Sequence, residues 1–403
     1  MRFSSVLLTI AASASVAWAD ASPSSGIPLT DYDAIIVGGG PSGLSALSGL
    51  ARVRRNVLLI DSGVYRNGPT RHMHDVIGFD GVTPAYYRWA ARRQLAHYAT
   101  VNMMNGTVTS IQPENNNTYF TVAADLGGDA GQQTFTARKV VLGTGLRDII
   151  PDTPGIHENW GSGIFWCPWC DGHEHADQAL GLLANMSEIA SLVREVSTLN
   201  SNVAAFVNGT DTEEQRAAAD RSFPDWETYL DIHNVRVYNG TIAQIDRLLN
   251  GTTGDEDPSL PSFPERDLFE VTFQDGQEPV LRNAFLASFP SAQASNVGPE
   301  AGVALYGGRL AADSSAGLST NIPGIYAIGD ANSDNVTNVP HALFSGKRTA
   351  VYLHVRLARE ETLAEIADAK AMSKRSDHEE ARGIWDRMNG KPGDILYAGH
   401  FDQ

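Results

Sequence analysis

The segment spanning residues 32–61 limits the possible folds of this chain more than any other part of the sequence. Residues 33–37 are apolar, 38–43 are rich in glycine, 44–51 follow a helical pattern, and 56–60 are apolar again. Short apolar runs bounded by glycine are typical of buried strands, and the stretch between them suits a helix. The order strand, glycine turn, helix, strand predicts a parallel βαβ unit.

The glycine turn of this unit carries the pattern G-x-G-x-x-G between the expected strand and the expected helix. Glycines at these positions let backbone amides approach a pyrophosphate at the positive end of the helix. Asp61 closes the second strand 18 residues after Gly43, where its carboxylate can accept hydrogen bonds from an adenosine ribose. The expected dinucleotide-binding residues are Gly38, Gly40, Pro41, Ser42, Gly43 and Asp61.

A second strand signal, near the end of the chain, favours FAD over NAD. Residues 321–330 read as a turn, a strand and a glycine turn, and a helix is expected from about residue 340 to residue 361. Asp330 ends this strand, where it can hold a ribityl hydroxyl or a phosphate of the flavin nucleotide. Residues 180–207, between the two pieces, read as strand, helix and strand, which predicts a smaller inserted α/β domain.

The charge balance excludes some classes of partner. The 403 residues include 30 Lys and Arg against 47 Asp and Glu, a formal charge of −17, and contain no long basic run. Nucleic acid and anionic membranes are therefore not expected partners.

The N-terminus predicts export from the cell. Arg2 precedes an apolar stretch at residues 6–17, and Ala17-Trp18-Ala19 follows as a small-x-small cleavage signal. The apolar stretch is too short to span a bilayer, so a signal peptide is favoured over a membrane anchor, and the mature protein is expected to be secreted and extracellular. The expected N-glycosylation acceptors are Asn105, Asn116, Asn185, Asn208, Asn239, Asn250 and Asn335.

The chain has two cysteines, and both lie in Cys167-Pro168-Trp169-Cys170. A structural disulfide closing so small a loop would stabilise a large protein by only about 2 kcal/mol. A zinc site using His173 and His175 is disfavoured because its two histidines are closer in sequence than is usual, and no metal is expected. A redox-active pair remains the favoured interpretation, with a helix beginning at the pair that lowers the thiolate pKa.

Four motifs together resemble the low-molecular-weight thioredoxin reductase family of flavoproteins, over roughly residues 32–354. They are the glycine turn at 38–43, Gly143-Thr144-Gly145, the cysteine motif with Asp171, and Gly329-Asp330. His72-Met73-His74 and residues 144–160 are similar to the fungal branch that contains secreted sulfhydryl oxidases and the dithiol oxidases of epidithio-toxin pathways.

This resemblance implies an α/β fold of two Rossmann-like, three-layer domains and a homodimer. A discontinuous FAD domain would hold an inserted, degenerate NADPH-type domain that carries the CxxC pair. The expected segments are a signal peptide at 1–19, the FAD domain at 31–150 and 289–361, the CxxC domain at 151–288, and a C-terminal tail at 362–403.

The resemblance also implies roles for single residues. Cys170 would face the flavin and Cys167 the substrate, and Asp171 would act as acid and base. His173 and His341 are further candidates for proton transfer, although His341 stands where reductases usually carry Gln. The residues implied at the flavin, besides the glycine turn and Asp61, are His74, Val108, Thr144, Gly145, Asp330, His341 and Ala342.

The segment in which a reductase carries a second glycine fingerprint lacks it. Residues 180–188 lack the three glycines and include the acceptor Asn185, and residues 208–214 are acidic where a 2′-phosphate needs arginines. Oxygen is therefore the expected acceptor, and the expected function is a secreted FAD-dependent thiol oxidase that converts glutathione or other small thiols and oxygen into disulfide and hydrogen peroxide. The alternatives are a dithiol oxidase acting on a secondary metabolite, an NADPH-dependent thioredoxin reductase, and a flavin-binding glycoprotein without activity.

Overall fold

The computed structural model describes residues 26–252 and 264–389, so the expected signal peptide lies outside the described residues. The chain divides into two compact units. One unit is residues 30–357, which contain every element that forms the site described below. The other joins residues 1–29 to residues 358–403, and its described part consists of residues 26–29 and the second half of one long helix.

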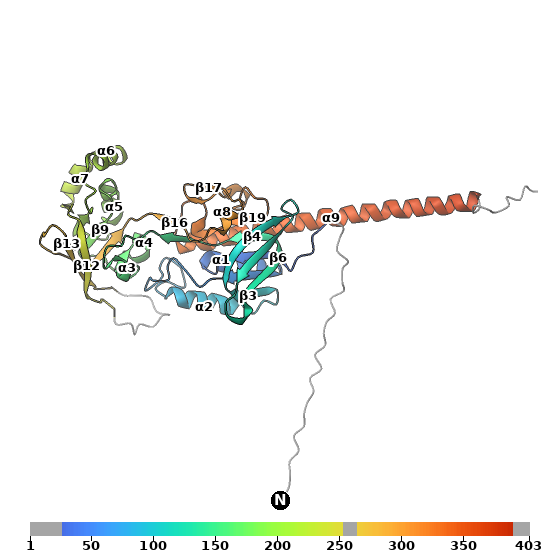
Figure 1. Ribbon diagram of the computed structural model, residues 1–403, viewed down its shortest axis with the longest axis horizontal. Helices are drawn as coiled ribbons and strands as arrows, with labels where there is room; N and C mark the ends of the chain where they lie inside the picture. Colours follow the sequence, from blue (N-terminus) through green and yellow to red (C-terminus); the bar gives the residue numbers. More distant parts are fainter. Residues whose placement is uncertain (1–25, 253–263, 390–403) are drawn as a thin grey trace, which may run out of the picture. The chain divides into compact units, whose positions relative to one another are not determined.

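A seven-stranded sheet in the order β3-β2-β1-β6-β5-β4, with β19 paired to β6, organises the first domain (Figure 1). Strands β3, β2, β1, β6 and β19 are parallel, and β5 pairs antiparallel with both β4 and β6. The strands are β1 (Tyr32–Val37), β2 (Val57–Asp61), β3 (Val101–Asn105), β4 (Thr107–Glu114), β5 (Tyr119–Asp125), β6 (Gln132–Leu142) and β19 (Ile325–Ala327).

The predicted βαβ unit is present as β1, helix α1 (Pro41–Ala51) and β2. Gly38 has a φ of +104°, and a Cβ on Gly43 would lie 1.9 Å from the carbonyl oxygen of Gly38. The turn thus needs glycine at one position for its backbone angle and at the other for close packing. Pro41 begins the helix, where its missing N–H has no intrahelical partner to lose.

Side chains cover both faces of this sheet, because neighbouring strand residues point to opposite sides. Ile36 packs with Leu47 of α1 and Leu353 of helix α9 (Val339–Asn389) on one face. Ile35 packs on the other face with residues that include Val297 of helix α8 (Val297–Glu300). The other elements of this domain are helix α2 (Pro84–Leu95), the hairpin of β17 (Leu305–Tyr306) and β18 (Arg309–Leu310), and short 3₁₀ turns.

A second, fully parallel sheet of five strands in the order β11-β10-β9-β15-β8 lies in the middle of the sequence. Its strands are β8 (Ile164–Phe165), β9 (Leu180–Leu183), β10 (Val203–Phe206), β11 (Arg236–Tyr238) and β15 (Ala284–Ala287). Helices α5 (Ile189–Val196), α6 (Glu213–Ser222) and α7 (Trp226–Ile232) belong to one side of the sheet. A three-stranded antiparallel sheet of β12 (Ile242–Leu249), β13 (Leu268–Phe273) and β14 (Val280–Arg282) packs on the other.

Two strands connect the domains. Strand β7 (Leu146–Asp148) leaves the first domain and pairs antiparallel with β16 (Ser291–Gln293), which returns to it (Figure 1). The short helices α3 (Ile156–Asn159) and α4 (Pro168–Asp171) follow β7 in the chain. The prediction of two Rossmann-like α/β domains, one discontinuous and one inserted, is thus confirmed.

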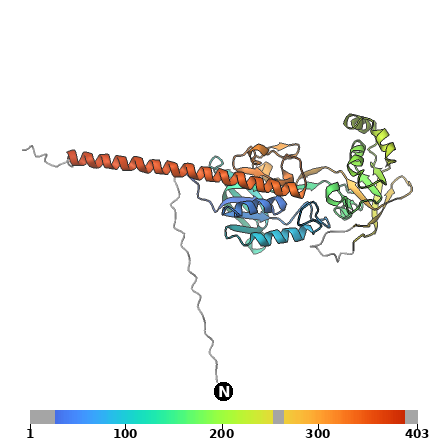
Figure 2. The same cartoon turned by 180° about the vertical axis from the view of Figure 1, so that it is seen from behind.

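Helix α9 differs from the expectation that a helix would end near residue 361, because it continues without a break to Asn389 (Figure 2). Residues 347–382 contain neither glycine nor proline and are rich in Ala, Glu, Lys and Arg, which favour a helix. Within the described residues, no helix is long and apolar enough to cross a membrane.

Candidate active site

One cavity of about 600 Å³ extends from the glycine turn after β1 to the cysteine pair at α4. This volume is in the range of small-molecule and cofactor sites. The cavity is lined by several stretches of the first domain that are far apart in sequence, and by Trp160, Trp166 and α4 of the second domain. The predicted site residues that line it are Gly38, Gly40, Pro41, Ser42, Asp61, His74, Val108, Thr144, Gly145, Cys170, Asp171, Asp330 and Ala342.

The walls of the cavity fit an extended dinucleotide such as FAD. A Cβ placed on Gly40 or on Gly145 would meet no atom within 4 Å, so both glycines leave their share of the cavity open. The hydroxyl oxygen of Thr144 is buried and has no hydrogen-bond partner among the described residues. Since buried polar groups are normally satisfied, this hydroxyl is suited to a polar atom of a bound cofactor.

Asp61 is buried and holds the glycine turn in place. Its Oδ1 accepts a hydrogen bond of 3.1 Å from the Gly39 amide, and its Oδ2 accepts one of 2.5 Å from the Tyr65 hydroxyl. Arg92 donates to Oδ2 over 3.1 Å. Burial, together with the bond to Asp61, raises the pKa of Tyr65 to about 12. The carboxylate expected to meet a ribose is therefore also part of the scaffold of the turn.

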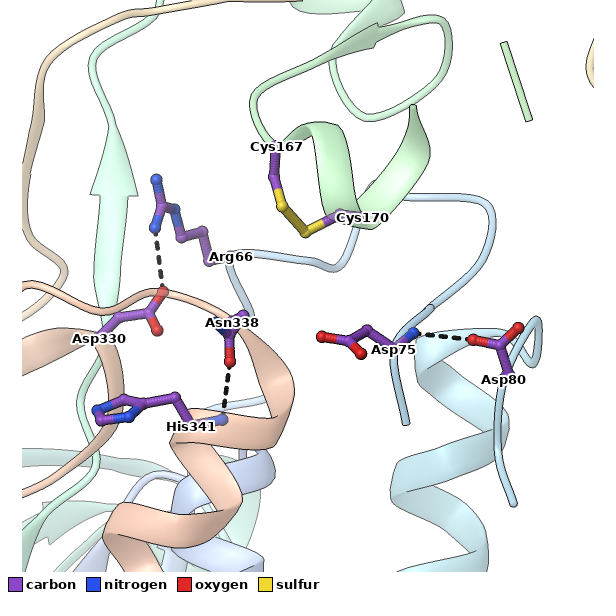
Figure 3. The surroundings of a disulfide bond; sticks show 8 residues. All are labelled: Arg66, Asp75, Asp80, Cys167, Cys170, Asp330, Asn338 and His341. Atoms are coloured by element: carbon purple, nitrogen blue, oxygen red, sulfur yellow. Dashed lines mark hydrogen bonds and ion pairs between the residues drawn. A yellow bond between two sulfur atoms is a disulfide. The ribbon is translucent and has the colours of Figure 1, made fainter. Parts of the chain in front are cut away.

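Arg66 joins two acidic residues of the cavity wall, Asp148 and Asp330, and Figure 3 shows its contact with Asp330. Its guanidinium donates to both carboxylate oxygens of Asp148, over 3.0 and 2.6 Å, and to Oδ2 of Asp330 over 3.1 Å. Burial raises the pKa of Asp330, and Arg66 and Arg309 act against that effect. Arg66 could not be predicted from the sequence, because nothing local to residue 66 indicates partners 82 and 264 positions further along the chain.

Cys167 and Cys170 form a disulfide at the start of α4 (Figure 3). Cys170 lines the cavity, whereas Cys167 is the residue that precedes the helix and does not line it. The helix expected to begin at the pair is a single turn that ends before Gly172, where a Cβ would lie 2.4 Å from the carbonyl oxygen of Pro168. So short a helix has only a small dipole.

Four predicted residues do not line the cavity. Gly43 packs against the turn, and Cys167 is bonded to Cys170 at the residue before α4. His173 is exposed to solvent. His341 directs Nε2 to Oδ2 of Asp334 over 2.7 Å.

A buried group of charged side chains beside α4 escaped the sequence analysis. Arg71 reaches from the first domain and donates to both oxygens of Asp267, over 2.7 and 3.0 Å, and to Glu265. Burial raises the pKa of Asp171 well above its ordinary value, and the charges of Glu265 and Glu174 add to this effect. The protonated form of Asp171 is therefore favoured beside Cys170, which suits this side chain to proton transfer.

Aromatic side chains form another part of the wall, close to the disulfide. Trp160 stacks on Trp166 at 5.0 Å between ring centres and on Phe289 at 5.6 Å. Trp169, between the two cysteines, is 70% exposed and also lines the cavity. A large exposed aromatic residue at this position offers an apolar contact to a substrate.

Comparisons of sequence agree with the motifs. The pyridine nucleotide-disulphide oxidoreductase family matches residues 32–190. A probable thioredoxin reductase of Arthroderma benhamiae is 43% identical over 342 residues, which cover 83% of this chain and 82% of that protein. The thioredoxin reductase sirT of Leptosphaeria maculans is 36% identical over 169 residues, or 41% of this chain and 50% of that protein.

Solved structures with the same fold include HlmI, which superimposes with a TM-score of 0.70 at 26% identity and covers 85% of this chain and 97% of its own. A putative thioredoxin reductase TrxB from Bacillus anthracis has a TM-score of 0.68 at 20% identity, with 82% and 99% covered. The second likeness concerns the fold alone.

Proposed function

Because this chain belongs to the thioredoxin-reductase-like FAD flavoproteins of the pyridine nucleotide-disulphide oxidoreductase family, as its motifs predicted, we propose that it is a thiol oxidase with oxygen as acceptor. Small thiols, with glutathione first, would deliver electrons to the Cys167–Cys170 disulfide. The family assigns FAD as the cofactor and an FAD-dependent oxidoreductase as the class of enzyme. The acceptor and the thiol are the proposal.

The observation that carries the choice of oxygen is the chemistry at the carboxyl ends of β9, β10 and β11. Nucleotides bind to parallel sheets outside these ends, on a glycine turn that leads into a helix. The turn after β9 reads Ala184-Asn185-Met186 and lacks the fingerprint. Asn185, Asn208 and Asn239, which follow the three strands, are exposed N-glycosylation acceptors. Sugars there would cover the edge that a nicotinamide nucleotide needs.

The cleft beside this edge also has the wrong charge for NADPH. It encloses about 430 Å³ and is lined by Ser187, Glu188, Ser191, Leu192, Glu195, Ala218, Ser222 and Ser288. Of the described residues that line it, two carry carboxylates and none is Lys or Arg. A 2′-phosphate is bound by arginine or lysine and is repelled by carboxylates.

The cysteine pair divides the reaction into two exchanges. A substrate thiolate attacks one sulfur and forms a mixed disulfide, and a second thiol releases the oxidised product. Cys170 lines the cavity, which supports a role for its sulfur in passing electrons onward and a role for Cys167 in meeting the substrate. FAD, when bound, accepts the two electrons and supplies the chemistry with oxygen.

We also propose that the protein is exported, glycosylated and dimeric, as its sequence predicts. All seven acceptor asparagines are exposed, as modification requires. Mass spectrometry of the secreted protein before and after deglycosylation tests export and occupancy together. Retention of the N-terminal segment, or unmodified asparagines throughout, would contradict the proposal.

A dithiol oxidase acting on a small cyclic dithiol is the second candidate function. The stacked Trp160, Trp166 and Phe289, with exposed Trp169, favour it because they offer apolar contacts that the charged glutathione does not use. Comparing kcat/KM for glutathione with that for a rigid aromatic dithiol separates the two candidates. A preference of more than about tenfold for the dithiol, about 1.4 kcal/mol, would favour the second.

Oxygen uptake by the purified protein tests the main proposal. We expect glutathione to consume one oxygen for each two thiols, and anaerobic glutathione to bleach the visible flavin absorbance. NADPH, in the parallel experiment, is expected to leave the flavin oxidised. Bleaching of the flavin by NADPH would contradict the choice of oxygen as acceptor. A failure of every thiol tested to cause oxygen uptake would contradict it as well.

A further inference from the structure

Nine side chains from four parts of the chain form a buried charged cluster next to Asp171. Glu265 is its centre: Arg71 donates to it, and His72 Nδ1 and His175 Nε2 lie 3.4 and 3.6 Å from its carboxylate oxygens. Arg247 lies 3.7 Å from Asp267. The titratable and charged groups that face one another are Arg71, His72, His74, Asp171, Glu174, His175, Arg247, Glu265 and Asp267.

This cluster is not built for a metal ion. His175, Glu265 and Asp267 offer ligand atoms within 4.8 Å of one another. However, the guanidinium of Arg71 donates to both of these carboxylates and supplies the positive charge that a metal would bring. Burial lowers the pKa of His175, which leaves its imidazole neutral at pH 7.

The cluster brings four carboxylic side chains together with two guanidinium groups. The carboxyl groups are those of Asp171, Glu174, Glu265 and Asp267, and the guanidinium groups are those of Arg71 and Arg247. Burial raises the pKa of Asp171 well above its ordinary value, because a buried charge without a partner is costly. The protonated form of Asp171 is therefore favoured, and its proton needs a path to solvent.

His74 connects the cluster to solvent. Its Nε2 lies 3.6 Å from Oε1 of the buried Glu174, and its Nδ1 lies 3.7 Å from Oδ1 of Asp80. The side chain of Asp80 is 58% exposed and is held by a hydrogen bond of 2.8 Å from the Asp75 amide (Figure 3). Each gap to His74 is slightly longer than a hydrogen bond, so a small rotation of the ring or one water closes it.

We propose, on the basis of the proposed function, that His74 relays the proton that accompanies thiol–disulfide exchange between Asp171 and solvent, through Glu174 and Asp80. In the first exchange a substrate sulfur bonds to Cys167, the Cys167–Cys170 bond breaks, and its electron pair leaves on Cys170. The proton of that first thiol goes to the cluster.

The second exchange completes the balance. A second thiol displaces Cys167, the substrate disulfide forms, and the proton of this thiol goes to Cys167. The two electrons and two protons then held by the cysteine pair and the cluster match those lost by the two thiols. The cysteine pair re-forms its disulfide by giving up these two electrons; bound FAD would supply the chemistry that passes them to oxygen, which leaves with the two protons as hydrogen peroxide.

Anaerobic reduction of the holoenzyme by glutathione, followed by the visible flavin absorbance, tests the relay. We expect His74→Asn, at equal flavin content, to slow the reduction about 10²-fold, as for loss of a proton-transfer group. Added imidazole should restore much of the rate, and the pH profile of the reduction should change. His157→Asn is the matched control, because this histidine is exposed in α3, outside the cluster, and its Nε2 lies 3.8 Å from the exposed Asp152.

Wild-type speed and an unchanged pH profile in His74→Asn would overturn the relay, and so would a slow variant that imidazole does not restore. A wild-type flavin that thiols fail to bleach would instead overturn the proposed function. In that case the pH dependence of alkylation of the reduced cysteines by iodoacetamide still tests whether His74 relays protons. The relay predicts that the pH of half-maximal alkylation differs between His74→Asn and the wild type, and an identical pH dependence contradicts it.

Discussion

Asp330 accepts a hydrogen bond of 3.1 Å from Arg66, a residue 264 positions earlier that also binds Asp148 through both of its carboxylate oxygens. The contact ties the loop after β2 to the turn after β19, and both lie at the flavin cavity. Arg66 therefore holds together two parts of the cavity wall that are far apart in sequence.

Arg66→Met is expected to weaken FAD binding, because it leaves two acidic side chains beside each other without their cation. The loss of a charged hydrogen-bonded partner corresponds to roughly 2–3 kcal/mol, or about a hundredfold in Kd. Titration of the apoprotein with FAD, followed by flavin fluorescence, measures the change. Arg66→Lys keeps the charge but loses the bidentate contact with Asp148, so its Kd for FAD should fall between those of the wild type and Arg66→Met. Equal Kd values for all three proteins would contradict a role of Arg66 in FAD binding.

Substitution of each cysteine separately should show which sulfur meets the substrate. Cys170→Ser leaves Cys167 free to form a mixed disulfide with a thiol that no resolving sulfur can release. Incubation with oxidised glutathione should add one glutathione to this variant, as intact-mass spectrometry detects. Cys167→Ser should be modified more slowly because Cys170 faces the cavity that the flavin fills. Faster modification of Cys170 than of Cys167 would reverse the assignment.

Asp171 gives the protein a dependence of stability on pH. Because its pKa is raised in the folded state, its contribution to stability is complete below the ordinary Asp pKa. That contribution is lost as pH rises through the raised value. Asp171→Asn has no proton to lose, so its melting temperature should fall less than that of the wild type as pH rises from the ordinary Asp pKa of about 4 into the alkaline range. Parallel melting curves over this range would contradict the raised pKa.

The flavin half of the site could be predicted from sequence because its constraints are local. Gly38 and Gly43 lie in one turn, and a side chain at either position would clash or distort the backbone. The position of Cys170 also follows from a four-residue motif. In each case the chemistry needs residues that are neighbours in the chain, so spacing alone carries the information.

The charged half of the site could not be predicted because its partners are distant in sequence. Arg71 and Asp267 are 196 residues apart, and each is an ordinary charged residue in its own segment. Only the packing of the loop after β2 against the second domain brings them together. The end of α9 was expected near residue 361 and lies at Asn389 for another reason. The composition of residues 347–382 favours a helix throughout, although no apolar pattern in the sequence requires one.

Arg71→Met tests whether the loop after β2 holds the two domains together. Removing Arg71 leaves Glu265 and Asp267 as buried carboxylates without their main partner, which typically costs 3–5 kcal/mol, as a rough estimate from other buried ion pairs. The pKa of each is lowered in the folded state, with Arg71 among the causes acting against burial. Their contribution to stability is therefore present above the ordinary carboxyl pKa and is lost as pH falls through the lowered values.

The difference in melting temperature between wild type and Arg71→Met should thus be largest above about pH 5 and should shrink towards pH 3. The triple variant Arg71→Met, Glu265→Gln, Asp267→Asn is the matched control, because it removes the carboxylates together with their partner. It should recover part of the stability at pH 7, since amides cost less to bury than unpaired carboxylates. An equal loss in the single variant at all pH values, with no recovery in the triple variant, would mean that Arg71 acts through packing and not through its charge.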